Sequence, residues 1–394
     1  ETASRTEPWN HIMRGHCFSI LVAVLLLAPS TPSRAEKPFR QRRILVNYDG
    51  GSTLYSRKGS QGPVRLTVGD LREAIREVSF EGSQVDTVLL CVNAQVMYYP
   101  TKVGTMLGSL ATPEQKKKLP RNTQQWIANL NHFVDRGIDP WAVMVAEAKR
   151  QKREVLLSFR MNDGHEGTHL ETRFWRENKE FHCFDPDQGH TLDYGHKEVR
   201  DHMFLLIQEA VRRYDCDGIE LDFNRFPILF KGGTTTERIA KMNGFVHRLR
   251  TMLDAEGKKR KRHLVLGVRP PTENYDVAAT YQGSRKVGCD PVTWARNGWI
   301  DFMTVSRFLS VTFDLPVAPW KKLITEVPVY GCIEIVDKKN GVALTPRQYR
   351  RASRHIWNEK ADGIYLFNFL ITREGSTEPA FEILNQIGSP DVVE

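Results

Sequence analysis

Residues 214–227 read Tyr-Asp-Cys-Asp-Gly-Ile-Glu-Leu-Asp-Phe-Asn-Arg-Phe-Pro, and they contain the clearest strand pattern of the chain. Apolar and polar residues alternate in it as they do in a short β-strand, and the acidic side chains fall on one face. The apolar residues that share the other face are Ile219, Leu221 and Phe223. Because the outward face of a barrel strand packs under helices, the pattern predicts that Glu220 and Asp222 point toward a barrel axis, with Asn224 continuing in that direction.

Similar short runs alternate with amphipathic stretches along the whole chain. Eight runs read as strands: residues 43–49, 87–93, 154–160, 218–223, 263–269, 301–306, 326–330 and 363–367. Helical spacing of apolar residues separates them, most clearly over residues 70–78, 197–213, 237–253, 290–296, 346–357 and 378–387. Eight strands with intervening helices predict an α/β fold, a single-domain (β/α)8 TIM barrel. An open doubly wound sheet is the alternative, but no glycine-rich phosphate loop follows the first strand.

Two insertions interrupt this alternation, at residues 94–125 after the second strand and residues 161–195 after the third. Both follow the carboxyl ends of strands, where the loops of a barrel build its site. Connections of this length are uncommon unless they are functional or disordered. We therefore expect both insertions to border the site.

The N-terminal segment carries the pattern of a secretory signal peptide. An apolar run at residues 20–28 follows Arg14, is too short to cross a bilayer, and precedes small residues up to Ala35. Met13 reads as the natural start, so residues 1–35 are expected to be an upstream extension and signal peptide, and residues 36–394 the barrel. This predicts a secreted or periplasmic protein without a membrane span after cleavage.

The net charge of +9 raises the question of a nucleic-acid partner. The densest basic runs, residues 116–118 and 258–262, carry no interleaved aromatics, and no nucleic-acid motif is present. We expect a solvated basic surface, no nucleic acid and no cofactor.

Of the six cysteines, Cys17 lies in the signal segment, and the odd number left is incompatible with a fully paired disulfide framework. Buried thiols are expected.

Polar residues fall at inward positions near the ends of several strands. By the same alternation Arg160 ends the third strand facing inward, Arg269 ends the fifth and Ser306 ends the sixth. Arginines and acids cannot be buried there unpaired, so we expect both arginines to lie near Glu220 or Asp222. These groups either neutralise one another, in a network that merely closes the barrel mouth, or bind a ligand.

The insertion after the third strand offers further candidates. Asn162 and Asp163 suit sugar hydroxyls, and Trp175 can stack on a sugar face. A zinc hydrolase would instead use His165, His169 and His182. That alternative lacks a His-x-His at the end of the first strand and any close-spaced His/Glu helix motif, so no metal site is expected.

Three segments carry a resemblance to a known family: residues 160–165, 184–200 and 214–227. They resemble the glycosyl-hydrolase-like (β/α)8 barrels of secreted bacterial proteins, over most of the mature chain. The resemblance implies carbohydrate hydrolysis as a class and leaves the sugar open.

A weaker similarity is to the chitinase-type family-18 glycosidases, whose fourth strand reads Asp-Gly-x-Asp-x-Asp-x-Glu. Asp217, Gly218 and Asp222 match this pattern, but Glu220 replaces one aspartate and Asn224 stands at the position of the catalytic glutamate. Kinship to chitinases would therefore imply an inactive enzyme or a lectin. In the retaining barrels of the α-amylase and α-galactosidase types, the nucleophile position is that of Asp222.

Glycoside hydrolysis requires two carboxyl groups flanking the scissile bond. Asp222 is the first, Glu220 is a deeper candidate, and the partner is sought among Glu273, Glu334 and Asp163, with Glu273 placed first. The residues expected to bind substrate are Asn93, Arg160, Asn162, Asp163, His165, Trp175, Asn224, Arg225, Arg269, Ser306 and Glu334. The expected function is hydrolysis of an extracellular poly- or oligosaccharide. The alternatives are a non-catalytic carbohydrate-binding barrel and a metal-dependent hydrolase.

Overall fold

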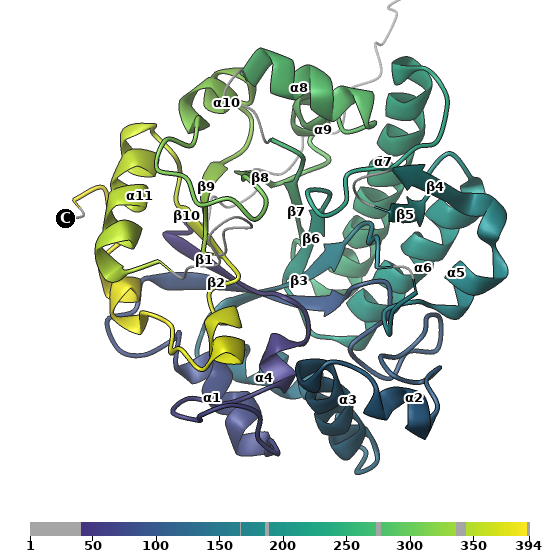
Figure 1. Cartoon of the computed structure of the whole chain (residues 1–394). Helices are drawn as coiled ribbons and strands as arrows, with labels where there is room; N and C mark the ends of the chain where they lie inside the picture. Colours follow the sequence, from purple (N-terminus) through teal and green to yellow (C-terminus); the bar gives the residue numbers. More distant parts are fainter. Residues whose placement is uncertain (1–40, 166, 186–188, 273–276, 336–343, 392–394) are drawn as a thin grey trace, which may run out of the picture. The chain divides into compact units, whose positions relative to one another are not determined.

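Eight parallel strands close into a barrel in the order β1-β10-β9-β8-β7-β6-β3-β2 (Figure 1). The computed structural model describes residues 41–165, 167–185, 189–272, 277–335 and 344–391. The barrel strands are β1 (Ile44–Tyr48), β2 (Val85–Asn93), β3 (Glu154–Arg160), β6 (Gly218–Asp222), β7 (Val265–Arg269), β8 (Phe302–Val305), β9 (Val329–Glu334) and β10 (Ile364–Phe367). The predicted (β/α)8 TIM barrel is confirmed.

Helices surround the strands (Figure 1). The α-helices are α1 (Val68–Arg76), α2 (Pro113–Lys117), α3 (Arg121–Val134), α4 (Pro140–Arg150), α5 (Arg173–Glu177), α6 (Lys197–Arg213), α7 (Thr235–Arg260), α8 (Val277–Lys286), α9 (Pro291–Arg296), α10 (Val317–Leu323) and α11 (Pro346–Asn358). The 3-10 helices are η1 (Gly50–Leu54), η2 (Lys179–Phe181), η3 (Ile371–Gly375) and η4 (Phe381–Asn385). Their starts follow the capping rules: Thr67 forms a capping box with Asp70, and Asp139 accepts hydrogen bonds from the first turn of α4.

Two predicted elements need correction. The seventh strand begins after Pro328, at Val329, rather than at residue 326. Proline has no N–H for the sheet ladder, which is why the strand starts behind it. The helix expected over residues 378–387 is only the short 3-10 helix η4, which begins two residues after Pro379; proline disfavours a helical backbone in the residue before it. The core residues of this stretch are Ile383, Leu384 and Ile387.

The predicted alternation of strand side chains is confirmed. Ile219, Leu221 and Phe223 belong to the core between the strands and the helices. A separate cluster fills the barrel interior: Leu45, Leu89, Leu156, Val265, Phe302, Tyr330, Cys332, Tyr365 and Phe367. At the inward position of β7 a glycine is required, because a Cβ on Gly267 would lie 2.0 Å from the Phe302 ring.

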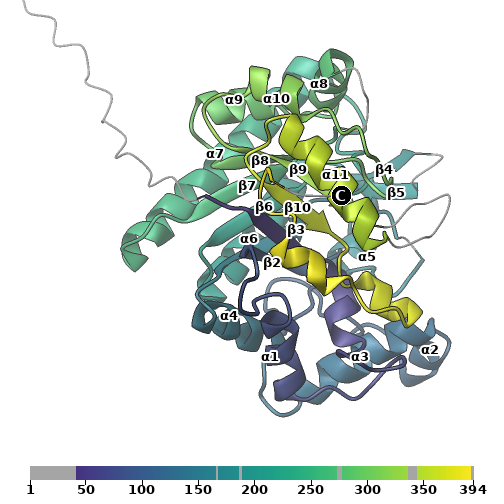
Figure 2. The ribbon, with the colours of Figure 1, turned by 90° about the vertical axis from the view of Figure 1, so that its left-hand side faces the viewer.

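The two insertions carry elements of their own. The first contains α2 and the start of α3, and the second contains α5, η2 and an antiparallel hairpin of β4 (His182–Asp185) and β5 (Gly189–Leu192). In the side view of Figure 2, α2, α5, β4 and β5 all lie on the right. The insertions therefore border one end of the barrel, the end that carries the polar residues described below.

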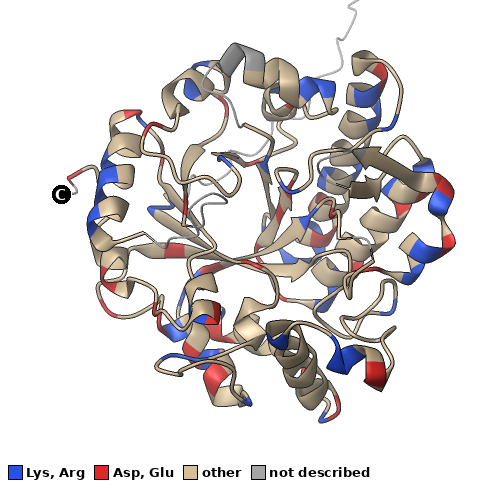
Figure 3. Ribbon diagram, in the orientation of Figure 1, with Lys and Arg blue, Asp and Glu red and all other residues tan. Residues whose placement is uncertain are grey.

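Lys and Arg are spread over the outer helices together with Asp and Glu (Figure 3). At the end of α7, Arg260 and Arg262 donate hydrogen bonds to backbone carbonyl groups of residues 211–216, before β7 begins.

The five cysteines from Cys91 onward are buried free thiols, as expected. Within the described ranges, no helix has both the length and the apolar character to cross a membrane. The signal-peptide prediction and the boundary at residue 36 lie outside the described residues.

Candidate active site

Asp222, the last residue of β6, lies at the centre of a polar cluster at the carboxyl ends of the barrel strands. Its Oδ2 accepts a hydrogen bond from Arg269 Nη2 at 2.5 Å, and its Oδ1 accepts one from the Asn224 N–H at 2.9 Å. Arg269 ends the neighbouring strand β7, donates to Ser306 Oγ at 3.0 Å, and lies 3.9 Å above the Phe367 ring. Four strands therefore fix the arginine that holds Asp222.

Glu220 lies one layer deeper in the barrel and is fully buried. Its Oε2 accepts hydrogen bonds from Ser158 Oγ at 2.8 Å and from Tyr365 OH at 2.9 Å. Asn47 Nδ2 lies 3.5 Å from the same oxygen. These partners come from β1, β3 and β10, so Glu220 connects opposite walls of the barrel.

Burial dominates the ionisation of Glu220. It raises the pKa of this carboxyl group to about 7, and the charge of Asp222 acts in the same direction. The positive charge of Arg269 and the hydrogen bonds from Ser158 and Tyr365 lower the pKa but do not offset burial. Glu220 is therefore a group that titrates near neutral pH beneath Asp222.

Asp49 follows β1 and forms a second ion pair at the barrel mouth. Its Oδ1 accepts hydrogen bonds from Arg160 Nη2 at 2.6 Å and Nε at 3.1 Å, and its Oδ2 lies 3.5 Å from Arg225 Nη1. Burial alone would raise the pKa of Asp49, but the charges of Arg160 and Arg225 outweigh it and the pKa lies below its usual value. Gly50 makes this close approach possible: its φ is +57°, and a Cβ there would lie 3.1 Å from Arg160 Nη2.

The sequence reasoning did not select Asp49. Arg160 is the strand-register partner of Asp222, but its guanidinium pairs with Asp49 and Asp163 rather than with Glu220 or Asp222 as expected. The signal was present, because Asn47 and Asp49 share the parity that was used for the other strands. Applied to the first strand, the same alternation would have placed Asp49 at the mouth.

Asp163 lies at the start of the insertion after β3. Its Oδ1 is hydrogen-bonded to His165 Nδ1, and its Oδ2 lies 3.4 Å from Arg160 Nη1. Burial acts to raise the pKa of Asp163, but the hydrogen bond and charge of His165, with Arg160 and Arg225, bring it below its usual value. Asp163 is therefore an ionised member of the same cluster.

Two bulky residues at the rim have a left-handed backbone, with φ of +46° at Phe226 and +47° at Leu309. Such conformations are rare for large side chains and concentrate at functional sites. The Phe226 ring packs edge-on against His165 with centroids 5.2 Å apart, and the Arg225 guanidinium lies 4.9 Å from the centroid of the Phe308 ring. The loops after β6 and β8 thus bring aromatic rings to the mouth.

Three of the predicted sugar-binding residues have other partners. Asn162 uses both ends of its amide on the backbone of Leu192 and Ile228. Asn93 bonds the backbone of Arg160 and Ala94, which joins the ends of β2 and β3. Trp175 is 4% exposed and stacks on His182 with centroids 3.7 Å apart. These side chains hold the insertion in place, and the ring face of Trp175 is covered.

The three candidates for the second carboxylate, Glu334, Asp163 and Glu273, have different surroundings. Glu334 ends β9, where it accepts hydrogen bonds from Asn368 Nδ2 at 3.1 Å and from the Ile335 N–H at 2.9 Å. Asp163 is ion-paired, as described above. Glu273 lies outside the described residues.

The side-chain amide of Asn224 is buried without hydrogen-bond partners. It is fully buried, yet neither its Nδ2 nor its Oδ1 has a hydrogen-bond partner. Oε1 of Glu220, Nε of Arg269 and Nε of Arg225 are likewise buried without partners. Buried polar groups are normally bonded, and exceptions call for an explanation such as a bound water, an ion or a catalytic role. Within the described ranges, no three His, Cys, Asp or Glu side chains are grouped to hold a metal ion.

No protein-family model and no curated protein matches this chain. Among solved structures, it is similar to alpha-L-fucosidase isoenzyme 2 from Paenibacillus thiaminolyticus, with 13% identity and a TM-score of 0.52 over 87% of this chain and 48% of the fucosidase. It is also similar to the PgaB (BpsB) glycoside hydrolase domain from Bordetella bronchiseptica, with 12% identity and a TM-score of 0.52 over 89% of this chain and 99% of that domain. The chain spans about half the length of the fucosidase. It shares the barrel fold of these glycoside hydrolases.

Proposed function

We propose that this protein is a glycoside hydrolase that acts on an extracellular poly- or oligosaccharide and uses Asp222 as its nucleophile. The observation that carries the proposal is the setting of Asp222 at the barrel mouth: Arg269 holds one carboxylate oxygen, and the unpartnered amide of Asn224 lies two residues away. A network that only closed the barrel would be expected to satisfy its buried amides. The carboxyl end of the strands is also where barrel enzymes have their sites.

The charges around Asp222 suit a reaction that develops positive charge at a sugar. Asp49, Asp163 and Asp222 are carboxylates held by arginine or histidine, and the rim carries the Phe226 and Phe308 rings. In a retaining glycosidase, one carboxylate attacks the anomeric carbon while a carboxylic acid protonates the leaving oxygen. The rings offer apolar faces for sugar stacking in place of the covered Trp175.

A non-catalytic carbohydrate-binding barrel is the second candidate, and one observation favours it. Both oxygens of Asp222 already accept hydrogen bonds, and Asn224 is an amide where the family-18 pattern has its acid. Such a protein would bind glycans with the same groups but leave their linkages intact. Export is part of either proposal and rests on the apolar run at residues 20–28.

Incubation with polysaccharides and a panel of 4-nitrophenyl glycosides tests the proposal. Release of reducing ends or nitrophenolate by the parent protein is expected, together with loss of that activity in Asp222→Asn. Glycan binding without hydrolysis, measured by calorimetry, would replace the enzyme with the binding protein. Neither hydrolysis nor binding across the panel would contradict both.

A further inference from the structure

Arg225 follows β6 and extends across the mouth of the barrel. Its guanidinium lies 4.9 Å from the centroid of the Phe308 ring, which follows β8, and its Nη1 lies 3.5 Å from Oδ2 of Asp49, which follows β1. In the barrel order, β7 separates β6 from β8, and β3 and β2 separate β6 from β1. Because the side chain reaches both of these neighbours, its guanidinium lies over the mouth, beyond the strand end that carries Asp222.

The guanidinium of Arg225 has few polar contacts for a side chain that is only 12% exposed. Among the described residues, Nη1 is the one nitrogen with an acceptor, and that acceptor, Asp49, is already held by Arg160 at 2.6 Å. The Nε of Arg225 is buried without a hydrogen-bond partner. The rings of Phe226 and Phe308 lie near the cation, but they do not replace the oxygen acceptors that its N–H groups prefer. Arg225 therefore keeps donors that a ligand can use.

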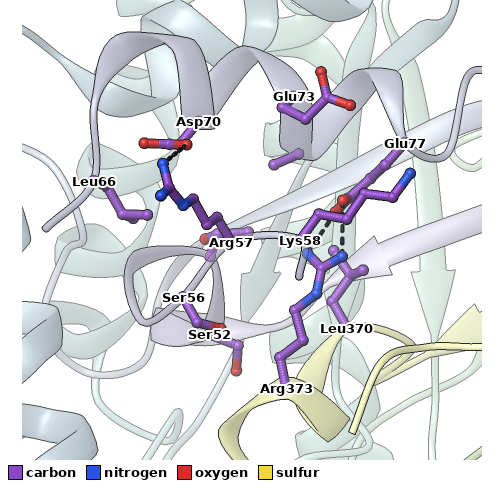
Figure 4. Close-up of a pocket in the computed structure, with 12 residues that line it drawn as sticks. Ser52, Ser56, Arg57, Lys58, Leu66, Asp70, Glu73, Glu77, Leu370 and Arg373 are labelled. Carbon is purple, nitrogen blue, oxygen red and sulfur yellow. Dashed lines mark hydrogen bonds and ion pairs between the residues drawn. The ribbon is translucent and has the colours of Figure 1, made fainter. Parts of the chain in front are cut away.

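Arg373 shows how another buried arginine of this chain is satisfied. Figure 4 shows Arg373 of η3 reaching Glu77 at the end of α1. Its Nη1 and Nη2 donate to the two oxygens of Glu77 at 2.7 and 2.8 Å, and its Nε donates to Glu378 at 3.1 Å. Burial lowers the pKa of Arg373, but the two glutamates outweigh it and the pKa lies above its usual value. Arg225 has no such set of acceptors.

The charges around Arg225 leave its own charge incompletely compensated. Burial and the positive charge of Arg160 lower the pKa of Arg225. The negative charges of Asp49, Asp163 and Asp222 act in the opposite direction, yet the pKa stays below its usual value. The other two arginines of the cluster have close carboxylate partners, and their pKa values are raised. A further negative charge beside Arg225 would therefore stabilise its protonated form.

Backbone strain marks both loops that meet at Arg225. Phe226 directly follows the arginine and has a φ of +46°, and Leu309 directly follows Phe308 and has a φ of +47°. Strain of this kind persists only where the surrounding structure enforces it, and it concentrates at ligand-binding and catalytic sites. Two constrained loops therefore fix the position of Arg225 before a ligand arrives.

We propose that Arg225 recognises an anionic group of the sugar and that the site takes acidic glycans. This inference rests on the proposed function, because it names the class of glycan for the same site. The group is the carboxylate of a uronic acid or a sulfate ester, since both present oxygen acceptors to the planar fork of a guanidinium. The net charge of +9 attracts polyanionic glycans in the same sense.

Calorimetry with matched acidic and neutral glycans tests the proposal. Polygalacturonate, alginate and hyaluronan carry carboxylates, and their methyl esters are the neutral counterparts. Dextran sulfate carries sulfate groups, and dextran is its neutral counterpart. At about 0.15 M salt, which screens the exposed charges, we expect the parent protein to bind at least one acidic glycan about tenfold or more tightly than its counterpart. The pair that shows this preference identifies the carboxylate or the sulfate as the group that is recognised.

Substitutions at Arg225 separate recognition by this side chain from general attraction to a basic protein. Arg225→Gln should weaken binding of the preferred acidic glycan by about 10–100-fold and leave binding of its neutral counterpart unchanged. Arg351→Gln is the matched control: it removes the same charge from an exposed arginine of α11 that lies 4.7 Å from the Phe313 ring, and it should bind as the parent does. If Arg225→Gln does not fold, Arg225→Lys serves instead, because it keeps the charge but not the planar fork and should still bind more weakly than the parent.

The outcomes distinguish this inference from the proposed function. Equal affinity for both members of every pair, or equal losses in Arg225→Gln and Arg351→Gln, would overturn the assignment. Faster hydrolysis in Arg225→Gln would also overturn it, because the arginine would then obstruct access to Asp222. Binding that depends on Arg225 without any hydrolysis would support this inference and remove the proposed enzyme, whereas hydrolysis of neutral glycans alone would do the opposite.

Discussion

Arg269 on β7 and Asp222 on β6 form an ion pair of 2.5 Å in which the two side chains are 0% and 3% exposed. The two residues are also register partners in the barrel, so the backbone of adjacent strands sets their separation. Removing one member of such a pair leaves the other charge buried without compensation. The fold should therefore lose stability when either side chain of the pair is removed.

We expect Arg269→Met to lower the free energy of unfolding by about 3–5 kcal/mol. The methionine keeps much of the apolar stem but leaves the Asp222 carboxylate uncompensated. Lys197→Met, which breaks an exposed pair with Asp201, is the control and should have little effect. Urea unfolding of both variants measures the difference, and equal small changes in the two would show that the buried pair does not stabilise the fold.

The raised pKa of Glu220 predicts a pH dependence of stability. Its pKa is about 7 in the folded protein against an ordinary value of 4.5, so between these values the unfolded chain loses the proton while the folded protein keeps it. The contribution is therefore present at low pH and is lost as the pH rises to about 7. Glu220→Gln lacks this loss and should gain on the order of 3 kcal/mol over the parent between pH 4 and pH 8. Parallel stability curves for the two proteins would contradict the buried, protonated Glu220.

Gly267 and Gly244 provide a matched pair of glycine substitutions. Gly267→Ala places a Cβ 2.0 Å from the Phe302 ring inside the barrel, and this overpacking should cost about 1–3 kcal/mol. Gly244→Ala lies on the exposed side of α7 with no atom within 4 Å, and there alanine should stabilise by about 0.5–1 kcal/mol because it favours the helix. Thermal unfolding should move in opposite directions. A shift of the same sign in both variants would mean that the interior of β7 has more room than the structure shows.

The alternation of side chains in strands allowed much of the barrel to be predicted. It placed the apolar and acidic faces of β6 and the inward direction of Arg160 and Arg269, because these follow from local geometry alone. The strand starts were less certain: β9 begins behind Pro328. The two-residue alternation of side chains does not indicate where the hydrogen bonds between neighbouring strands begin or end.

The partners of the site residues depend on contacts between distant parts of the chain. Asn162 suits a sugar hydroxyl by its chemistry, but residues 192 and 228 occupy its amide. Glu374 has no strand pattern to mark it, and its contacts with Ser52 and Asn122 arise only because η1, η3 and α3 meet in the folded chain. Residue type therefore indicated the chemistry of the cluster, and the tertiary fold decided which members are available.

Kinetics of Asp222→Asn on a hydrolysed glycoside decide whether Asp222 is the nucleophile. The amide keeps the size of the side chain but removes the negative charge and the attacking oxygen. We predict that kcat falls by several orders of magnitude while glycan binding, measured by calorimetry, stays near that of the parent. A kcat within about threefold of the parent would remove Asp222 from the mechanism, because loss of even one assisting group typically costs about 10²–10⁴-fold.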